Sequence, residues 1–226
     1  MLNTQKTTLV ALNGLLLLGA VSAAHANTQS FSSVLGSAAV PFTTSFSLPL
    51  FDPTIGTLTG VRIDFTNNVV GQVQIRNFDS VTHNYSNVGA QIPVTLTNPD
   101  SSTFAVTATT SPLHSGSIAG GNTAVTFIGD PGTNSGFLNV GVGNFSFYQG
   151  AAGSFGNYSA VGSSTTTGTS DGGLNVGFSS GGSASGTAQV TYTFAPVVGT
   201  PEPGTWGLLM AGGSTGLVLL RRRRRK

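Results

Sequence analysis

Residues 187–194 read TAQVTYTF, a stretch in which large apolar side chains alternate with polar ones. The large apolar side chains fall on one face of an extended chain: Val190, Tyr192 and Phe194. The polar side chains fall on the opposite face: Gln189, Thr191 and Thr193. Such alternation is typical of a β-strand that buries one face. The stretch therefore predicts a strand at the surface of a β-sheet core.

The same alternation recurs upstream and predicts about eight strands in total: 45–50, 61–65, 69–75, 92–97, 104–109, 123–128, 136–142 and 187–194. Groups of turn-forming residues separate them: 52–53, 67–68, 98–101, 120–122 and 130–132. No long window keeps a helical period. We therefore expect residues 27–200 to form one all-β domain, an antiparallel β-sandwich of the jelly-roll or immunoglobulin-like kind.

Residues 150–186 differ from the rest of this body, because Gly, Ser, Thr and Ala dominate them and Asp171 is their only charge. They offer little apolar surface to bury, apart from one strand-like group: Leu174, Val176 and Phe178. The composition predicts long loops with one or two edge strands. A disordered linker is the alternative.

Charge is scarce in this chain of 226 residues. Only 7% are Asp, Glu, Lys or Arg, against about 25% in a typical soluble protein. Within residues 27–200, Arg62 and Arg76 stand against six aspartates, a net charge of −4. A nucleic-acid partner needs a basic surface with several phosphate contacts, so the composition argues against one. The chain has no Cys, which excludes disulfides and thiolate chemistry.

The N-terminus has the three-part layout of a secretory signal peptide. Lys6 supplies the positive charge, residues 9–21 are mostly apolar, and Ala24 and Ala26 frame a small-residue cleavage site. We expect residues 1–26 to direct export and signal peptidase to cut after Ala26. A retained membrane anchor is the alternative, although the apolar run is short for a bilayer core of about 30 Å.

The C-terminus combines three features in a fixed order. A rigid, extended tripeptide comes first, because proline blocks helix propagation: Pro201, Glu202 and Pro203. Residues 204–220 carry no charge and would form a helix of about 25 Å, close to a membrane span, with Trp206 at one interface. A basic run then marks the cytoplasmic side: Arg221, Arg222, Arg223, Arg224, Arg225 and Lys226. A buried apolar helix with a solvated tail is the alternative.

This tail, with PEPGTW, a glycine-bearing apolar span and an arginine run, resembles the PEP-CTERM sorting signal of exported bacterial proteins. The resemblance covers residues 201–226 and implies recognition by a membrane-embedded exosortase, with processing near the motif. It implies a transient single-pass stage in the inner membrane, C-terminus in the cytoplasm, before transfer to the cell envelope or the extracellular space. It also makes exopolysaccharide an expected partner. The same tail has been labelled an ice-binding-protein C-terminal domain, which shows no ice binding here.

A second resemblance concerns the start of the body. Residues 48–61 read LPLFDPTIGTLTGV, and this stretch is similar to the beginning of an exported domain called choice-of-anchor E. That domain occurs with several alternative C-terminal anchors. The resemblance agrees with the predicted strands but implies no catalytic residues and no mechanism.

Few residues of the body suit catalysis or metal binding. His83 and His114 are its only histidines and are expected to be surface residues in turns. The aspartates are scattered, so no local motif indicates a zinc site, a calcium loop or a glycosidase pair. A G-x-S-x-G pattern at 212–216 lies inside the apolar tail, away from any partner His or Asp. We therefore expect no enzyme activity, no catalytic or metal-binding residues and no cofactor.

Aromatic residues cluster between 137 and 158 and suggest a carbohydrate-contacting face: Phe137, Phe145, Phe147, Tyr148, Phe155 and Tyr158. The alternative is that they form core and ordinary surface. Three hypotheses follow. The leading one is an exported structural or adhesive protein of a polysaccharide-rich matrix. The second is a lectin-like module that binds glycan through loops between 130 and 160. The third is a secreted hydrolase, which requires two carboxylates in a cleft.

Overall fold

The computed structural model describes residues 26–197, and Ala26–Ala195 form a compact unit. The predicted sorting elements lie outside the described residues: Ala24, the motif 201–203, the apolar segment 204–220 with Trp206, and the basic run 221–226. Ala26 is the first described residue and is exposed. Among residues 26–197, no helix is long and apolar enough to cross a membrane.

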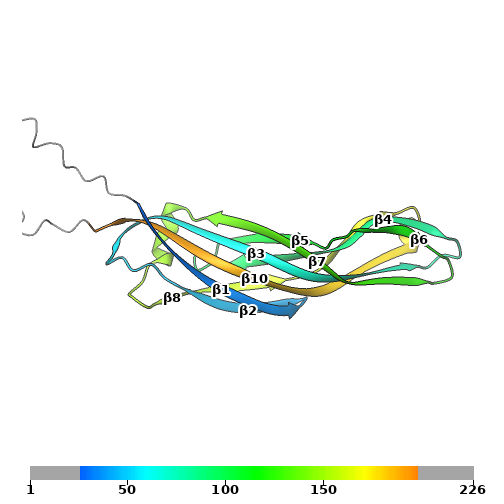
Figure 1. Cartoon of the computed structure of the whole chain (residues 1–226), viewed down its shortest axis with the longest axis horizontal. Coiled ribbons are helices and arrows are strands. Elements are labelled where there is room, and N and C mark those ends of the chain that lie inside the picture. Colours follow the sequence, from blue (N-terminus) through cyan, green and yellow to red (C-terminus); the bar gives the residue numbers. More distant parts are fainter. Residues whose placement is uncertain (1–25, 198–226) are drawn as a thin grey trace, which may run out of the picture. The chain divides into compact units, whose positions relative to one another are not determined.

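The described chain is built of strands, with two short 3-10 helices between them (Figure 1). The elements follow in this order: β1 (Asn27–Ala39), β2 (Phe42–Pro49), β3 (Gly56–Asn77), β4 (His83–Thr97), β5 (Thr103–Thr109), β6 (His114–Ile118), β7 (Ala124–Asn139), η1 (Val142–Tyr148), β8 (Phe155–Gly162), β9 (Thr165–Ser170), η2 (Gly173–Asn175) and β10 (Val176–Pro196). The expected all-β class is confirmed.

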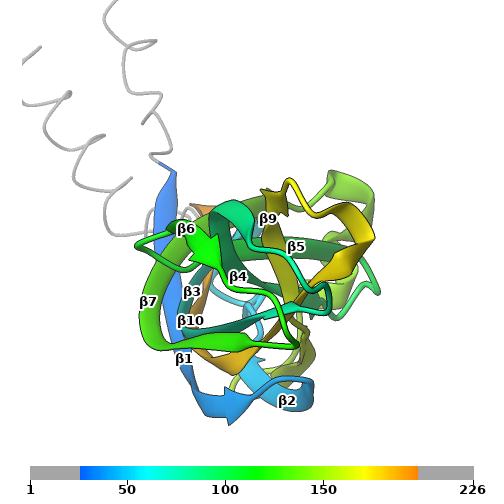
Figure 2. The same cartoon turned by 90° about the vertical axis from the view of Figure 1, so that its right-hand side faces the viewer.

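The strands form two antiparallel sheets packed face to face, as the end-on view in Figure 2 shows. One sheet has the order β1-β10-β3-β7, and the other has the order β2-β8-β4-β5 with β6 and β9 also paired to β4. The pairing is nested: β1 pairs with β10, β2 with β8, β3 with β7, and β4 with β5. The predicted antiparallel sandwich is therefore correct.

Strand β4 organises the larger sheet because it is paired along both edges. Its residues 91–97 pair with β5, and residues 83–88 pair with β6 further along the same edge. On the opposite edge, β8 pairs with residues 94–97 and β9 with residues 85–91. Two short strands on each side thus cover one long strand. Such coverage leaves few free backbone groups on β4.

The space between the sheets holds three consecutive apolar clusters. The first contains Tyr148, Tyr158 and Tyr192, the second surrounds Phe65 and Leu96, and the third lies at the far end of β3. Strand β3 contributes to all three through its inward residues: Val61, Ile63, Phe65, Val69, Val73 and Ile75. Burying one such side chain stabilises the fold by about 1.5–3 kcal/mol.

Asn67 and Asn68 were expected to form a turn, and this prediction is wrong. The predicted strands 61–65 and 69–75 are one continuous strand, β3, which passes through both asparagines. Asn67 is fully buried, and its side-chain amide donates to the backbone oxygens of Ile92, at 2.8 Å, and Val106, at 2.9 Å. The donors of this buried amide thus find partners, whereas its Oδ1 has none among residues 26–197. These bonds connect β3 to the opposite sheet.

The turn expected at 130–132 is also wrong, because strands 123–128 and 136–142 are joined in β7. Gly71 is opposite Asp130 and Gln72 is opposite Ile128, so β7 has one extra residue there. The extra residue is Gly129, whose φ is +82°. A glycine with positive φ at such a position is a β-bulge, which lets a strand continue through turn-forming residues.

Residues 150–186 are more regular than their composition predicts. They contain β8, β9 and the first half of β10, rather than long loops with one or two edge strands. Their small side chains pair in register with larger partners, as where Gly156 lies opposite Leu48 and Gly162 opposite Phe42. The pairing partners, and not local apolar content, make these segments strands. Strands β1 and β6 were likewise not expected.

Candidate functional site

Two groups of polar side chains lie near opposite ends of β3. One surrounds His83 just after β3 ends, and we call it the histidine clamp: Asp79, His83, Asn84, Asp171 and Asn175. The other surrounds a surface hollow near the start of β3. Each group combines segments that are distant in sequence, and the fold brings these segments together.

The histidine clamp holds both nitrogens of one imidazole. His83 Nδ1 lies 3.1 Å from Asp171 Oδ1, and His83 Nε2 lies 3.2 Å from Asp79 Oδ2. The expectation of a surface histidine in a turn is wrong here, since His83 starts β4 and only 15% of its side chain is exposed. A neutral imidazole carries one N–H, whereas the imidazolium carries two. Only the protonated ring therefore donates to both carboxylates.

The electrostatics of the clamp agree with this geometry. The hydrogen bond with Asp79 raises the pKa of His83, and Asp171 adds to the effect. In turn, the bond with His83 holds the pKa of Asp79 below its usual value. The backbone N–H of Asn84 is the main cause of the lowered pKa of Asp171. Each charged group of the clamp thus has hydrogen-bond partners within the clamp. The Asp79 carboxylate also accepts from Asn175 at 3.0 Å.

His114 is partly buried rather than a free surface residue. It begins β6, its Nε2 lies 2.7 Å from Asp130 Oδ2, and 16% of its side chain is exposed. Its ring stacks on Phe127 at 3.7 Å between centroids. The hydrogen bond and the stacking fix β6 against β7. We assign His114 a packing role.

Asp100 binds the loop between β4 and β5 to η1. Its carboxylate accepts from Ser102 Oγ at 2.6 Å, Tyr148 Oη at 2.9 Å and Asn144 Nδ2 at 2.8 Å. Burial raises the pKa of Asp100, but these hydrogen bonds outweigh it and hold the pKa below its usual value. Burial also raises the pKa of Tyr148 strongly. With all its partners inside the fold, this carboxylate is structural.

The positions of the described His and Asp side chains can be compared with what a metal site and a glycosidase pair require. Within residues 26–197, no group of three or more His, Asp or Glu side chains is arranged to hold a metal ion. Asp79 and Asp171 come near one another, but the ring of His83 stands between them. A glycosidase pair needs substrate between its carboxylates. The clamp therefore lacks the geometry that the hydrolase hypothesis requires.

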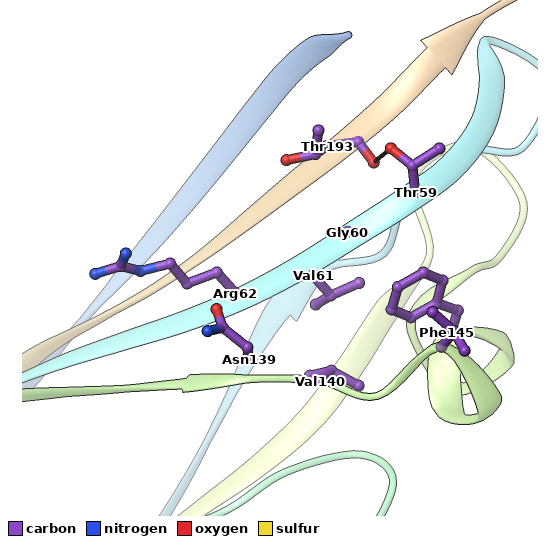
Figure 3. A pocket seen from close by; sticks show the side chains of 9 residues that line it. Thr59, Gly60, Val61, Arg62, Asn139, Val140, Phe145 and Thr193 are labelled. Atoms are coloured by element: carbon purple, nitrogen blue, oxygen red, sulfur yellow. Dashed lines mark hydrogen bonds between the residues drawn. The ribbon is translucent and has the colours of Figure 1, made fainter.

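The hollow lies near the start of β3 and has a volume of about 340 Å³. Figure 3 shows its lining residues, which come from β3, the end of β7, η1 and β10. They are Thr59, Gly60, Val61, Arg62, Asn139, Val140, Val142, Phe145 and Thr193. Ligand pockets start at about 300 Å³. The hollow is thus large enough for a small ligand or one unit of a polymer.

The hollow joins an apolar floor to a polar rim. Val61, Val140 and Phe145 are buried members of the first core cluster, whereas Val142 is 79% exposed. On the rim, Thr59 Oγ1 donates to the backbone oxygen of Thr193 at 3.0 Å, the dashed line in Figure 3. The rim therefore presents polar groups above an apolar surface.

Arg62 is held at the edge of the hollow by two neighbours. Its Nη2 lies 2.7 Å from Asp64 Oδ1, its Nε also donates to that carboxylate, and its guanidinium lies 4.1 Å from the centre of the Phe137 ring. Bidentate pairing and stacking fix an arginine fork. Asp64 also cancels its charge. The rim is consequently rigid and close to neutral.

The side chain of Asn139 is a polar group of the rim without a hydrogen-bond partner among residues 26–197. It is exposed at the end of β7 opposite Arg62, and its side chain makes no hydrogen bond to any residue among 26–197. An amide side chain offers two donors and one acceptor. This side chain therefore has free hydrogen-bonding capacity beside the hollow.

The predicted aromatic face is divided by the structure. Three of its members are buried core residues: Phe145, Tyr148 and Tyr158. The other three are more than half exposed: Phe137, Phe147 and Phe155. Of the exposed three, Phe137 stacks against Arg62 beside the hollow. The three buried rings are core, as the alternative predicts, and carbohydrate contact stays a prediction for the three exposed rings.

The outward side of the four-stranded sheet is largely neutral and polar, and we call it the neutral polar face. It presents exposed or half-buried hydroxyl and amide side chains: Thr28, Ser30, Ser32, Thr66, Asn68, Gln72, Gln74, Thr126, Thr133, Ser135, Thr187, Gln189, Thr191 and Thr193. Apolar side chains interrupt it: Val34, Val70, Ile128 and Phe137. Three charged side chains also lie on this side: Arg62 and Asp64, which pair with each other, and Arg76, which donates to Asn122. Some hydroxyls pair across strands, as Ser30 does with Thr191 at 2.9 Å. The hollow lies at one end of this face.

Sequence reasoning missed most of the hollow. Alternation at 61–65 places Arg62 and Asp64 on one strand face, so that pair was within reach. Sheet pairing brings together Thr59, Asn139 and Thr193. The local sequence pattern does not predict which strands pair.

No family model matches this chain, and no curated protein matches it either. Among solved structures, a structure of infectious bursal disease virus Gt strain is similar at 16% identity and a TM-score of 0.15, covering 88% of this chain and 50% of the viral chain. A VP2 subviral particle of the same virus gives 16% identity and a TM-score of 0.15, with 88% and 49% covered. This chain thus spans about half the length of those viral chains. Such low TM-scores carry no argument about fold or function.

Proposed function

We propose that this chain is an exported, non-enzymatic protein with a structural or adhesive role in a polysaccharide-rich matrix. In this proposal, residues 1–26 are a signal peptide and residues 201–226 are a PEP-CTERM sorting signal handled by an exosortase. The sandwich is the part delivered to the cell envelope or the extracellular space. The sequence resemblance at 201–203 and the basic run at 221–226 support the route.

The neutral polar face is the observation that carries the proposed role. Its hydroxyl and amide groups exchange hydrogen bonds readily with sugar hydroxyls and water. Sparse charge avoids both strong attraction and strong repulsion within a hydrated polymer. Such a surface suits many weak contacts along a polysaccharide rather than one tight complex.

The mass of the mature extracellular protein tests the route. A species that begins near Asn27 and ends near Pro201 supports export followed by sorting and processing. A species that keeps residues 221–226 means that the tail is a permanent anchor. Recovery of the uncut chain from the cytosol contradicts the proposal altogether.

A lectin-like module is the second candidate, and the hollow favours it. We infer that the nested strand pairing makes the body a jelly roll, a sandwich type found among lectin domains. A shared fold does not establish a shared function. The specific support is the apolar floor beneath the polar rim of Arg62 and Asn139. A glycan array with the mature chain tests this candidate, and uniform absence of binding removes it.

A further inference from the structure

We propose that the hollow at the start of β3 is a subsite for one neutral pyranose unit of a glycan. The inference rests on the lectin-like candidate function and names its site and its ligand class. The polymer would continue from this subsite over the neutral polar face. Each part of the argument concerns a different property of the hollow.

The first property is the match between its two surfaces and a sugar ring. A pyranose has C–H groups that form apolar patches, and hydroxyls around its edge. Val140, Val142 and Phe145 supply an apolar surface on one side of the hollow. Asn139 and Thr193 supply polar groups on the rim. Binding sites commonly combine an apolar lining with a few placed polar groups that set orientation.

The second property is spare hydrogen-bonding capacity. The Asn139 amide has no partner among residues 26–197, and the hydroxyl of Thr193 likewise makes no side-chain bond within that range. Occupied donors offer little to a ligand, because a new bond must replace an old one. Rim groups without a protein partner exchange only their bonds to water when a ligand binds, so no hydrogen bond within the fold is lost.

The third property is preorganisation. Arg62 is fixed by Asp64 and Phe137, and Thr59 is bonded to the backbone of Thr193. Val61, Val140 and Phe145 are set in the first core cluster. Ligand binding thus orders few side chains, which reduces its entropic cost. This matters for a shallow site with few contacts.

The fourth property is local neutrality, which decides the class of sugar. The Arg62 charge is cancelled by Asp64 at 2.7 Å, and the lining contains no other charged residue. A uronate or a phosphorylated sugar would lose hydration without gaining a free cation. A neutral sugar avoids this penalty.

The experiment titrates the whole chain, held in a zwitterionic detergent without a sugar head group. The probes are neutral tetrasaccharides of glucose, galactose and mannose, and a glucuronate tetrasaccharide of the same length. Calorimetry or NMR gives the dissociation constants. We expect at least one neutral probe to bind more tightly than the glucuronate probe.

The variants Asn139→Ala and Thr193→Val locate the site. Each removes one polar group of the rim, and each is expected to weaken neutral-probe binding by about tenfold, the size of one lost hydrogen bond. Asn157→Ala is the matched control, because Asn157 is an exposed strand asparagine on the other sheet. It should leave binding unchanged.

The possible outcomes distinguish failure of the proposed subsite from failure of the lectin-like function. Binding of a neutral probe that is unaffected by Asn139→Ala and Thr193→Val overturns the hollow as the subsite but retains a lectin-like function. Tighter binding of the glucuronate probe overturns the neutral ligand class. Failure of every probe to bind overturns both the inference and the lectin-like candidate.

Discussion

The polar side chains at the two ends of β3 differ in how many of their hydrogen-bonding groups already have partners. At the histidine clamp, the carboxylates of Asp79 and Asp171 are both occupied by His83 and nearby amides. At the hollow, the charges of Arg62 and Asp64 cancel, while Asn139 stays free beside an apolar floor. The end with more titratable groups therefore has less to offer a ligand. Free hydrogen-bonding capacity, rather than the number of charges, is therefore the feature on which the proposed binding end rests.

The largest expected effect concerns the aromatic core beneath the hollow. Tyr192 is fully buried and its hydroxyl donates to the backbone oxygen of Pro49 at 2.9 Å. Tyr192→Ala should lower the free energy of unfolding by about 3–5 kcal/mol, because it leaves a large cavity. Tyr192→Phe should cost about 1 kcal/mol for the lost bond. Denaturant unfolding measures both values.

Tyr158 is the matched control, because its buried hydroxyl has no partner among residues 26–197. Tyr158→Phe should leave the free energy of unfolding unchanged or raise it, since an unsatisfied buried group is removed. Equal losses for the two Tyr→Phe variants would contradict the assigned hydrogen bonding.

The next effect concerns the connection between the sheets midway along β3. Asn67→Ala removes two bonds to the opposite sheet and leaves buried backbone oxygens without that donor. We expect a loss of about 1–3 kcal/mol in the free energy of unfolding. Asn68→Ala is the control, because this neighbour is exposed and should change stability by no more than about 0.5 kcal/mol. Similar values for the two variants would argue against a bridging role for Asn67.

The third effect is the pH dependence of stability that His83 contributes in the histidine clamp. The pKa of His83 is raised in the fold, chiefly by Asp79, above an unfolded value of about 6.5. Its stabilisation is thus fully present below pH 6.5 and is lost as the pH rises through the folded pKa. The unfolding temperature should fall over this range in the natural chain. His83→Gln should flatten the curve, and an unchanged slope would show that the clamp does not depend on the imidazolium.

The smallest effect on stability is expected at the rim of the hollow. Arg62→Gln breaks an ion pair whose arginine side chain is 50% exposed, and exposed pairs contribute little. The unfolding temperature should barely move, whereas binding of a neutral tetrasaccharide should weaken as the rim loses its fixed edge. Thermal unfolding and calorimetry on the same sample compare the two. A large drop in unfolding temperature would mean that Arg62 serves the fold instead.

Alternation was sufficient to predict the fold class, because a sandwich buries one face of most strands. Strands with large alternating side chains, such as 187–194, were found where expected. Local composition misplaced the boundaries at 67–68 and 130–132. The side-chain N–H groups of Asn67 donate to the opposite sheet, and the bulge at Gly129 lets β7 continue. Strand β9 consists of Thr, Gly and Ser residues, and its strand conformation depends on pairing with β4. The hollow depends on sheet pairing too, so its members could not be read from the sequence.

A residue-resolved titration tests the central claim most directly. NMR spectra of the labelled whole chain are recorded while the best-binding neutral tetrasaccharide is added. We predict that signals of Asn139, Val142 and Thr193 shift with a common saturation curve and that those of His83 and Asp171 do not. Shifts centred on the histidine clamp, or none at either end, would contradict the claim that the hollow is the binding end of this sandwich.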